Sequence, residues 1–437
     1  MTLPWKITVV ADFGSDHDTP VSATLGDDLL ATLGVRAKVK GAPGGAREFQ
    51  FASEADFSPA AVAKALGGDP SAADIDAVLH DPAFQRVESA WRGLQRLLAA
   101  CGDDVLVDVV SSGRKALGDR FRSMVFEPTL SSAEPTSMVV VDHDFTHKSK
   151  DLAILEEIGT MAMQMQAPLV AGAGPGFFDL RYVAHVPTVP DIVDRLHDTG
   201  HSGWVEFQGT PPARWIALTI NRFLARPPYT GDHDETTDEG RPETFSWARG
   251  GWLVGAAVAR SVATHGHALD IAGTKGGGFD GLPVRDYPKA ANETITLASE
   301  APLDEQTTQH LYRSAFVPLL GALRRDVIVM PMVLTTFRLR PGHPTVEAAL
   351  SYQLTAGRVA TFLSFALGAL PDGSAEDRAS HLRGELAGFL GGLLGENPDE
   401  ALSVEAVDDG KAAAIEITPP ITLETKPLNL KFTVPLG

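Results

Sequence analysis

Two histidines stand four residues apart where a helix is predicted over 187–201. On a helix this spacing puts His197 and His201 on one side, where two imidazoles can bind the same metal ion. In helical metalloprotease motifs a glutamate beside the first histidine acts as the base, but Asp198 has that place here and Gly200 weakens the helix. We therefore predict no metal-ligating residue from this pair.

A second polar cluster, Asp142, His143, Asp144 and His147, follows the apolar run 138–141. α/β enzymes often place ligands directly after a strand, so one interpretation is a metal-dependent enzyme that uses the 142–147 region. Alternation along the strand would turn His143 away from both aspartates. A solvated loop or a contact between subunits is therefore the favoured interpretation, and the enzyme is the alternative.

The glycine-rich segment GTKGGGFDG, 273–281, invites comparison with phosphate-binding loops. Such a loop reads Gly-x-x-x-x-Gly-Lys-Ser/Thr between a strand and a helix, so that amides and the lysine surround a phosphate. Here Lys275 precedes the glycines and Leu-Pro follows them. The sequence also lacks a Gly-x-Ser-x-Gly elbow, and Cys101 has no recognisable nucleophile setting. We predict no catalytic residue and no cofactor.

The element around which the chain is organised is a helix over 80–102. Asp81 can cap this helix, Pro82 suits its first position and Gly102 supplies a flexible end. Apolar residues follow at steps of three and four, so they form one stripe. The residues of this stripe, which we predict to be buried, are Phe84, Val87, Trp91, Leu94 and Leu98.

Beyond this helix the pattern alternates between strands and helices, which predicts an α/β fold with a mixed, largely parallel sheet flanked by helices. After residue 336 two long helices precede several strands, which predicts a C-terminal α+β part. The expected strands lie at 5–12, 105–110, 138–141, 169–171, 402–407, 413–417 and 428–434, and the expected helices at 114–125, 152–165, 345–370 and 375–394.

The string IDAVLHDPAFQRVESAWRGL, 75–94, closely resembles the opening of the large sheath subunit of type VI secretion systems, the TssC/VipB/EvpB family. A second stretch, ARWIALTINRFLARPPY, is similar to the family's strand followed by Pro-Arg-Phe-Leu and Arg-x-Pro-Tyr. Arg222, Phe223 and Arg226 match this pattern, whereas Asn221 stands where a proline is common. The resemblance covers about 74 to the C-terminus, and Arg222 and Phe223 are its expected packing residues.

The first residues, LPWKITVVADFG, resemble the start of the small sheath subunit, TssB/VipA, and ADFSP at 55–59 is similar to that subunit's Asp-Phe-x-Pro. We therefore expect three parts. They are a small-subunit-like module at 1–70, a sheath α/β core at 71–335, and C-terminal helices and strands at 336–437.

The resemblance implies a structural subunit of a contractile injection machine and no enzymatic activity. Copies would form a homo-oligomeric helical sheath around an inner tube of an Hcp-like protein, and contraction would propel the tube. The implied partners also include a baseplate, and they can include a ClpV-like recycling ATPase and a separate TssB-like small subunit.

The last strand, 428–434, alternates apolar and polar residues. An edge strand exposes N–H and C=O groups that can pair with another chain, and the family resemblance favours such pairing between subunits. Pairing inside its own subunit is the alternative. The apolar positions of this expected inter-subunit strand are Leu428, Leu430, Phe432 and Val434.

The segment 230–242 is polar and acidic and contains Asp232, Asp234, Glu235, Asp238 and Glu239. Such a composition predicts a loop that faces solvent. Arg222 and Arg226 precede this loop, and we expect both to anchor packing within the subunit.

The amino-acid composition of the chain excludes some classes of binding partner. The 437 residues carry 37 basic and 56 acidic side chains, and a net charge of -19 opposes binding to nucleic acid or anionic membranes. Cys101 is the one cysteine, so no internal disulfide can form and a reducing, cytoplasmic setting is expected. No stretch reaches the roughly 18 apolar residues that span a bilayer, so we predict no membrane insertion.

Overall fold

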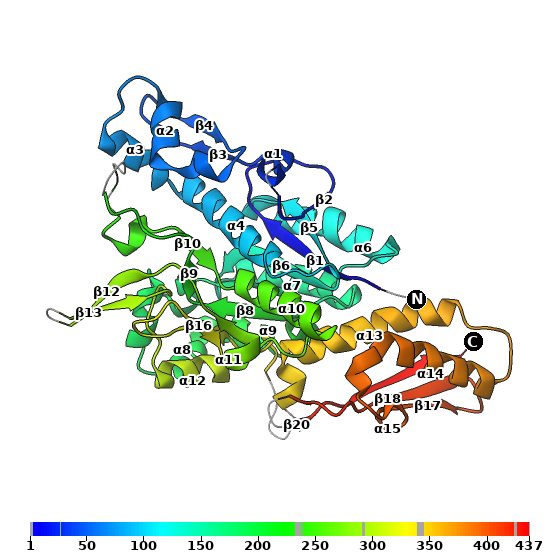
Figure 1. Ribbon diagram of the computed structural model, residues 1–437. Helices are drawn as coiled ribbons and strands as arrows, with labels where there is room; N and C mark the ends of the chain where they lie inside the picture. Colours follow the sequence, from blue (N-terminus) through cyan, green and yellow to red (C-terminus); the bar gives the residue numbers. More distant parts are fainter. Residues whose placement is uncertain are drawn as a thin grey trace.

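A seven-stranded sheet lies at the centre of the computed structural model (Figure 1), which describes residues 3–26, 28–231, 237, 239–290, 293–338, 345–423 and 426–436. Its strand order is β14-β8-β7-β6-β1-β5-β2, and only the edge strand β2 runs antiparallel to its neighbour. The predicted α/β fold with a largely parallel sheet is confirmed. The strands are β1 (Trp5–Ala11), β2 (Val21–Ser22), β5 (Val105–Ser111), β6 (Met138–Phe145), β7 (Leu169–Ala173), β8 (Ile216–Ile220) and β14 (Val317–Pro318).

Each face of this sheet carries its own hydrophobic cluster, because side chains alternate along every strand. In β6, Val140 faces the cluster that contains α4 and α10, whereas Val139 and Val141 face the cluster that contains α5, α7 and α9. The sheet is therefore covered on both sides, as a parallel sheet requires. These helices are α4 (Pro82–Leu98), α10 (Gly251–His265), α5 (Leu117–Phe121), α7 (Ser149–Gln164) and α9 (Ser202–Phe207).

Helix α4 begins where the sequence predicts, with the Asp81 side chain accepting a hydrogen bond from the Ala83 N–H. Its apolar stripe is buried in the hydrophobic cluster that α4 shares with α10 and one face of the sheet. Gly93 lies where the two helices approach most closely, since a Cβ there would be 2.5 Å from Trp252 Nε1. The five stripe residues Phe84, Val87, Trp91, Leu94 and Leu98 are all at most 6% exposed.

The N-terminal residues contribute to the fold in two ways. Strand β1 lies between β5 and β6, with Val9 opposite both Val109 and Val140, so it fills the middle of the sheet. A small antiparallel hairpin and two short helices pack around the N-terminal end of α4, and a third short helix lies nearer to β2 (Figure 1). These elements are β3 (Arg36–Val39), β4 (Arg47–Gln50), α1 (Leu29–Leu33), α2 (Pro59–Leu66) and α3 (Ala72–Leu79).

The C-terminal part packs around a hydrophobic cluster of its own. Arg358 joins it to the sheet domain, because its buried guanidinium donates hydrogen bonds to the carbonyls of Leu3 and Pro4 at 2.6 and 3.1 Å. Burial lowers the pKa of Arg358 to about 10. The elements are α13 (Leu350–Gly368), α14 (Ala375–Leu390), α15 (Pro398–Ala401) and an antiparallel sheet of β17 (Leu402–Val407), β18 (Ala412–Ile417) and β21 (Leu430–Pro435).

The remaining elements are short helices and strands, of which β19 and β20 belong to the C-terminal part. No helix among the described residues is long and apolar enough to cross a membrane. The remaining helices are α6 (Glu127–Ser131), α8 (Ile192–Leu196), α11 (Gly273–Gly276) and α12 (Glu305–Arg313). The remaining strands are β9 (Arg222–Leu224), β10 (Trp247–Arg249), β11 (Gly277–Phe279), β12 (Arg285–Ala290), β13 (Glu293–Leu297), β15 (Leu320–Gly321), β16 (Ile328–Met330), β19 (Thr422–Leu423) and β20 (Lys426–Pro427).

The helix predicted over 187–201 is wrong. The segment instead contains the single helical turn α8 between two 3₁₀ turns, Val183–Thr188 and Thr199–His201. Pro187 and Pro190 remove backbone donors and Gly200 costs helix stability, so a continuous helix cannot form here.

Candidate functional site

Charged side chains gather at the carboxyl ends of the parallel strands, where α/β proteins usually place functional groups. The first group, which we call the sheet-edge network, consists of charged side chains that pair with one another within the subunit. Arg249 contacts Asp142 at 3.3 Å and Asp144 at 3.0 Å, and Trp252 Nε1 donates to Asp142 at 2.9 Å. Its other pair is a two-pronged contact in which Arg222 donates to both oxygens of Glu300 at 2.6 and 2.9 Å.

This arrangement gives the 142–147 region little acid–base chemistry. Burial raises the pKa of Asp144, but the guanidinium groups of Arg249 and then Arg222 outweigh it and hold that pKa below its usual range. His143 points to the opposite face of β6, as alternation predicts, and contacts the Ser112 carbonyl at 3.0 Å. The interpretation of this segment as a solvated loop is wrong, because β6 continues to Phe145 and both Asp142 and His143 are buried in it. Burial and the charge of Arg249 lower the pKa of His143. The network has the character of a structural clamp at the end of β6, and it gives the enzyme alternative no support.

A second buried group, the Arg226 network, joins four segments of the chain. Arg226 donates to Glu88 of α4 at 2.8 Å and to both oxygens of Glu239 at 2.7 and 2.8 Å. Arg92 then links Glu88 to Glu54 of the N-terminal segment, at 3.1 and 2.6 Å. The network therefore ties the residues before 70 to α4 and to the segment that follows β9.

The electrostatics of this network are those of buried, compensated charges. Arg226 stacks over the Tyr229 ring at 3.7 Å, and the Tyr229 N–H donates to Glu239 at 2.9 Å. Burial raises the pKa of Glu239, yet its hydrogen bonds from Arg226 and His80 outweigh this and the pKa is lowered. Burial also raises the pKa of Tyr229 to about 12. These groups keep one charge state near neutral pH, which suits packing and not proton transfer.

The expectation that the acidic segment 230–242 faces solvent is wrong for Thr237 and Glu239, whereas Thr230, Gly231, Gly240 and Arg241 are exposed as expected. Glu239 and Thr237 are 3% and 0% exposed, because Glu239 is the bidentate partner of Arg226 and Thr237 donates to Asp76 at 2.6 Å. Asp232, Asp234, Glu235 and Asp238 lie outside the described residues. Removal of the whole segment would therefore leave Arg226 without its main partner.

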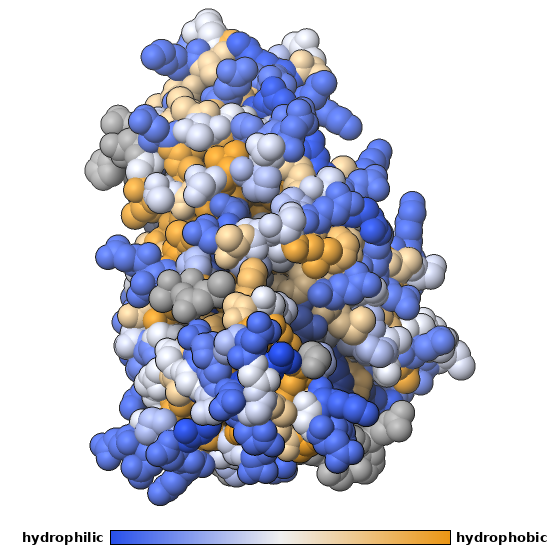
Figure 2. Space-filling model, turned by 90° about the vertical axis from the view of Figure 1, so that its right-hand side faces the viewer, coloured by the Kyte–Doolittle hydropathy of each residue, from blue (hydrophilic) through white to orange (hydrophobic). Residues whose placement is uncertain are grey.

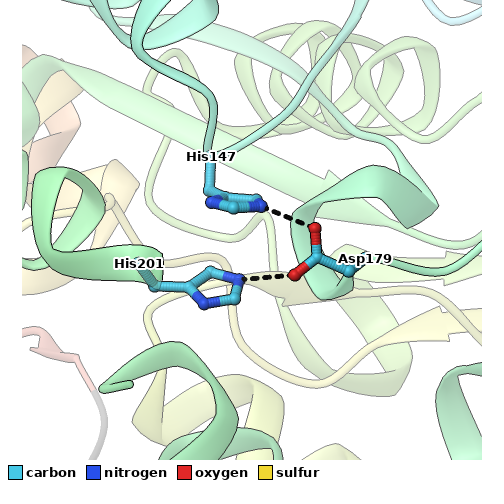
Figure 3. Close-up of side chains that lie close together, drawn as sticks. All are labelled: His147, Asp179 and His201. Atoms are coloured by element: carbon cyan, nitrogen blue, oxygen red, sulfur yellow. Dashed lines mark hydrogen bonds and ion pairs between the residues drawn. The ribbon is translucent and has the colours of Figure 1, made fainter. Parts of the chain in front are cut away.

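A third group, the histidine cluster, brings together residues from both polar motifs of the sequence (Figure 3). His147, from the turn after β6, and His201, from the turn before α9, stack with ring centroids 3.9 Å apart. Asp179 accepts a hydrogen bond from His147 at 3.0 Å and lies 3.8 Å from His201 Nε2. His197 is not part of the cluster, since it is exposed and contacts the Val193 carbonyl.

Asp179 is expected to make stability depend on pH at the acidic end. Burial raises its pKa, but the hydrogen bonds from His147 and Lys148 lower it to about 2, below the value near 4 of an unfolded aspartate. Its contribution is therefore complete above about pH 4 and is lost as the pH falls toward 2. Asp179→Asn should lower the urea midpoint at pH 5 and converge with the parent near pH 2. Equal differences at both pH values would contradict the assignment.

The glycine-rich turn has no phosphate-binding geometry. Arg260 Nη2 donates to the carbonyls of Gly276 and Gly278 at 2.6 and 3.0 Å, so carbonyl oxygens and not amides face the charged group.

Burial raises the pKa of Cys101 to about 11, which keeps this thiol protonated and unreactive at neutral pH.

Strand β21 pairs with β18 of the same chain, and its apolar residues face the C-terminal cluster. Within the described residues, no strand pairs with its other side. The terminal strand therefore has both an internal partner and an open edge, the two alternatives that the sequence left open. Its apolar residues lie at Leu430, Phe432 and Val434, and Leu428 is buried just before it.

The expected packing residue Phe223 lies in the sheet cluster beside the sheet-edge network.

Sequence reasoning missed three residues that complete these groups: Glu88, Glu239 and Asp179. Glu88 sits on the predicted polar face of α4, and its burial follows only from contact with Arg226, 138 positions away. Asp179 adopts a left-handed backbone conformation at the end of a 3₁₀ turn, a position without a sequence motif. The one available signal was the cluster of Arg, Pro and Tyr at 226–229 next to acidic residues.

Known sequences that are similar to this chain come from sheath proteins. The sequence family VipB, described as "EvpB/VC_A0108, tail sheath N-terminal domain", matches residues 71–333. The type VI secretion system sheath protein TssC1 of Pseudomonas aeruginosa is 24% identical over 281 residues, which cover 58% of this chain and 56% of that protein. The matched region thus spans little more than half the length of this relative.

Three solved structures align with this fold. A chain of the anti-feeding prophage baseplate, determined by cryo-EM, has a TM-score of 0.46 at 10% identity over 99% of this chain and 89% of that one. Sheath tail proteins from Listeria innocua and Desulfitobacterium hafniense have TM-scores of 0.39 and 0.40 at 9% identity. These two alignments cover 76% and 73% of this chain, and 61% and 60% of those chains.

Proposed function

We propose that this chain, which belongs to the VipB (EvpB/VC_A0108) family of tail sheath proteins, is a structural subunit whose copies polymerise into the helical sheath of a type VI secretion-like machine. In this proposal the sheath forms in the cytoplasm around an inner tube and contracts to propel it. The driving energy is stored in the interfaces between subunits, so the subunit itself performs no chemical step.

The open edge of β21 is the observation that supports this assembly most directly. Leu436 N–H donates to the Lys411 carbonyl at 2.9 Å, in register with the β18–β21 ladder. Since donors alternate along an antiparallel strand, the N–H groups of Lys431 and Thr433 point away from β18. Pro435 occupies the next outward position, where the lack of an N–H costs the ladder nothing. A strand from a second subunit can pair with this side.

The surface of the subunit favours strand pairing over a large apolar interface. Figure 2 shows a face on which hydrophilic side chains predominate and hydrophobic patches are separated. Among the described residues, four large hydrophobic side chains are strongly exposed, and they come from separate segments of the chain: Leu25, Leu130, Tyr182 and Leu323. Main-chain hydrogen bonds can join such surfaces without a broad apolar patch.

Thr433→Pro is expected to abolish tubes while it leaves the melting temperature nearly unchanged, because it removes an outward N–H and keeps the ladder with β18. The measurements are negative-stain microscopy and thermal unfolding of the full chain. Thr433→Ala is the matched control, since it keeps the N–H and should form tubes. Phe432→Pro removes an inward donor and should lower the melting temperature.

Tubes at the parental yield from Thr433→Pro would rule out pairing along this edge of β21. Point substitutions are needed here because Leu430 and Leu436 are buried in the C-terminal cluster. Truncation of the strand would expose that cluster and would not separate assembly from folding.

We further propose that residues 1–70 act as a small-subunit-like module within the same chain, ahead of a sheath core at 71–335 and a C-terminal part at 336–437. The central position of β1 and the link from Glu54 to Arg92 support its integration into one subunit. An Hcp-like inner tube, a baseplate and a ClpV-like ATPase are the proposed partners. Tubes formed by the chain alone would show that a separate TssB-like subunit is dispensable.

A further inference from the structure

We propose that His147, Asp179 and His201 form a binding site for a divalent transition metal of the Zn²⁺ type, independent of the proposed sheath function. Two imidazole nitrogens and a carboxylate are the donor set that zinc commonly binds in proteins. One ligand atom from each residue lies within 4.8 Å of the other two. The cluster thus collects three zinc ligands from three separate segments of the chain.

The imidazoles converge on the carboxylate, as Figure 3 shows. His147 Nε2 lies 3.0 Å from Asp179 Oδ1, and His201 Nε2 lies 3.8 Å from Asp179 Oδ2. Ligands about 2.0–2.2 Å from one zinc ion lie roughly 3–3.5 Å from each other, so small side-chain shifts bring all three into range. His201 Nε2 donates a hydrogen bond to the Phe177 carbonyl at 2.9 Å, so an ion must displace this proton to bind at Nε2.

A second carboxylate orients one of the two histidines. Asp198 Oδ1 lies 2.7 Å from His201 Nδ1, so this nitrogen is protonated and donates a hydrogen bond to the carboxylate. The same pairing of a carboxylate with the remote nitrogen of a histidine is a feature of zinc sites, where it fixes the ring and makes the ligating nitrogen more basic. The contact with Asp198 thus fixes the His201 ring so that Nε2 lies beside the Phe177 carbonyl and the Asp179 carboxylate.

The imidazoles of His147 and His201 are buried, whereas the carboxylate of Asp179 is accessible to solvent. The side chains of His147 and His201 are 2% and 0% exposed, whereas that of Asp179 is 37% exposed. An ion can therefore reach the site from the side of Asp179.

Two cations also compete for Asp179. Lys148 Nζ and Arg195 Nη2 lie 3.0 and 3.3 Å from its oxygens. Their side chains are 63% and 42% exposed, so each can turn into solvent when the ion binds. A bound ion would then join three turns of the chain: the turn after β6, the turn that ends at Asp179 and the turn before α9.

The experiment titrates the metal-stripped full-length protein with Zn²⁺ by calorimetry at pH 7.5 and records the absorption spectrum of the Co²⁺ form. We expect one Zn²⁺ per chain, visible Co²⁺ bands typical of a four-coordinate site, and a higher melting temperature with Zn²⁺. Asp179→Asn and His201→Gln should each weaken binding by roughly 100-fold or more, and Asp198→Asn by about 10–100-fold.

His197→Gln is the matched control, because this histidine lies four residues from His201, is exposed and points away from the cluster. It should keep the affinity and the Co²⁺ spectrum of the parent. The exposed position of Asp179 keeps the test valid even if His201→Gln fails to fold. The proposal is overturned if the parent shows no saturable Zn²⁺ binding, or if His197→Gln loses as much affinity as Asp179→Asn.

Discussion

Arg226→Met is expected to lower the free energy of unfolding by about 3–5 kcal/mol, because it leaves two buried carboxylates without their main partner. Glu88 and Glu239 are almost fully buried, and the guanidinium contacts both within 2.8 Å. Methionine keeps most of the side-chain volume, so the loss reports the charge and not a cavity. Guanidinium or urea unfolding at pH 7 measures it.

Two controls separate this effect from a general sensitivity to lost charges. Arg122→Met breaks a surface pair with Glu157 at 3.2 Å and should cost less than about 1 kcal/mol. Adding Glu88→Gln and Glu239→Gln to Arg226→Met removes the uncompensated charges and should restore part of the loss. An Arg226→Met protein that unfolds at the parental denaturant concentration would refute a structural role for the network.

Phe84→Ala is expected to cost about 3–5 kcal/mol in the free energy of unfolding, because it opens a cavity where the N-terminal hairpin meets α4. The ring is fully buried and packs edge-on against three other aromatic rings. Its centroid lies 6.3, 5.4 and 5.9 Å from those of Phe49, Phe51 and Phe57. Chemical denaturation of the full chain is the measurement.

Leu130→Ala is the control for this cavity, because Leu130 is 59% exposed and its truncation should change the free energy of unfolding by less than about 0.5 kcal/mol. Phe84→Leu should fall between the two, since leucine fills part of the space. A cost below about 1 kcal/mol for Phe84→Ala would mean that the hairpin does not depend on α4.

The sequence predicted elements well where the signal is local. Asp81 caps α4 as expected, and the alternation of β6 places His143 opposite Asp142 and Asp144. The predicted helix 187–201 failed for a local reason too, because its prolines and Gly200 outweigh the histidine spacing that suggested it.

The prediction for the acidic loop failed for another reason. Composition alone describes Glu239 as solvent-facing, because carboxylates are seldom buried without a partner. The partner, Arg226, precedes it by 13 positions, and both oxygens of Glu239 meet the guanidinium only after the chain turns back. A charge pattern therefore predicts exposure correctly only where folding brings no opposite charge close.

By itself the sequence determined the helical stripe of α4, the parallel α/β architecture and the membership of a sheath family, because periodicity, caps and family motifs depend on residues close together in the chain. Only the tertiary structure decided which charged groups meet. Glu88 and Arg226 are 138 positions apart, and Asp179 lies between His147 and His201 of two separate motifs. Such contacts depend on how strands and turns pack in space, and no local spacing encodes that packing.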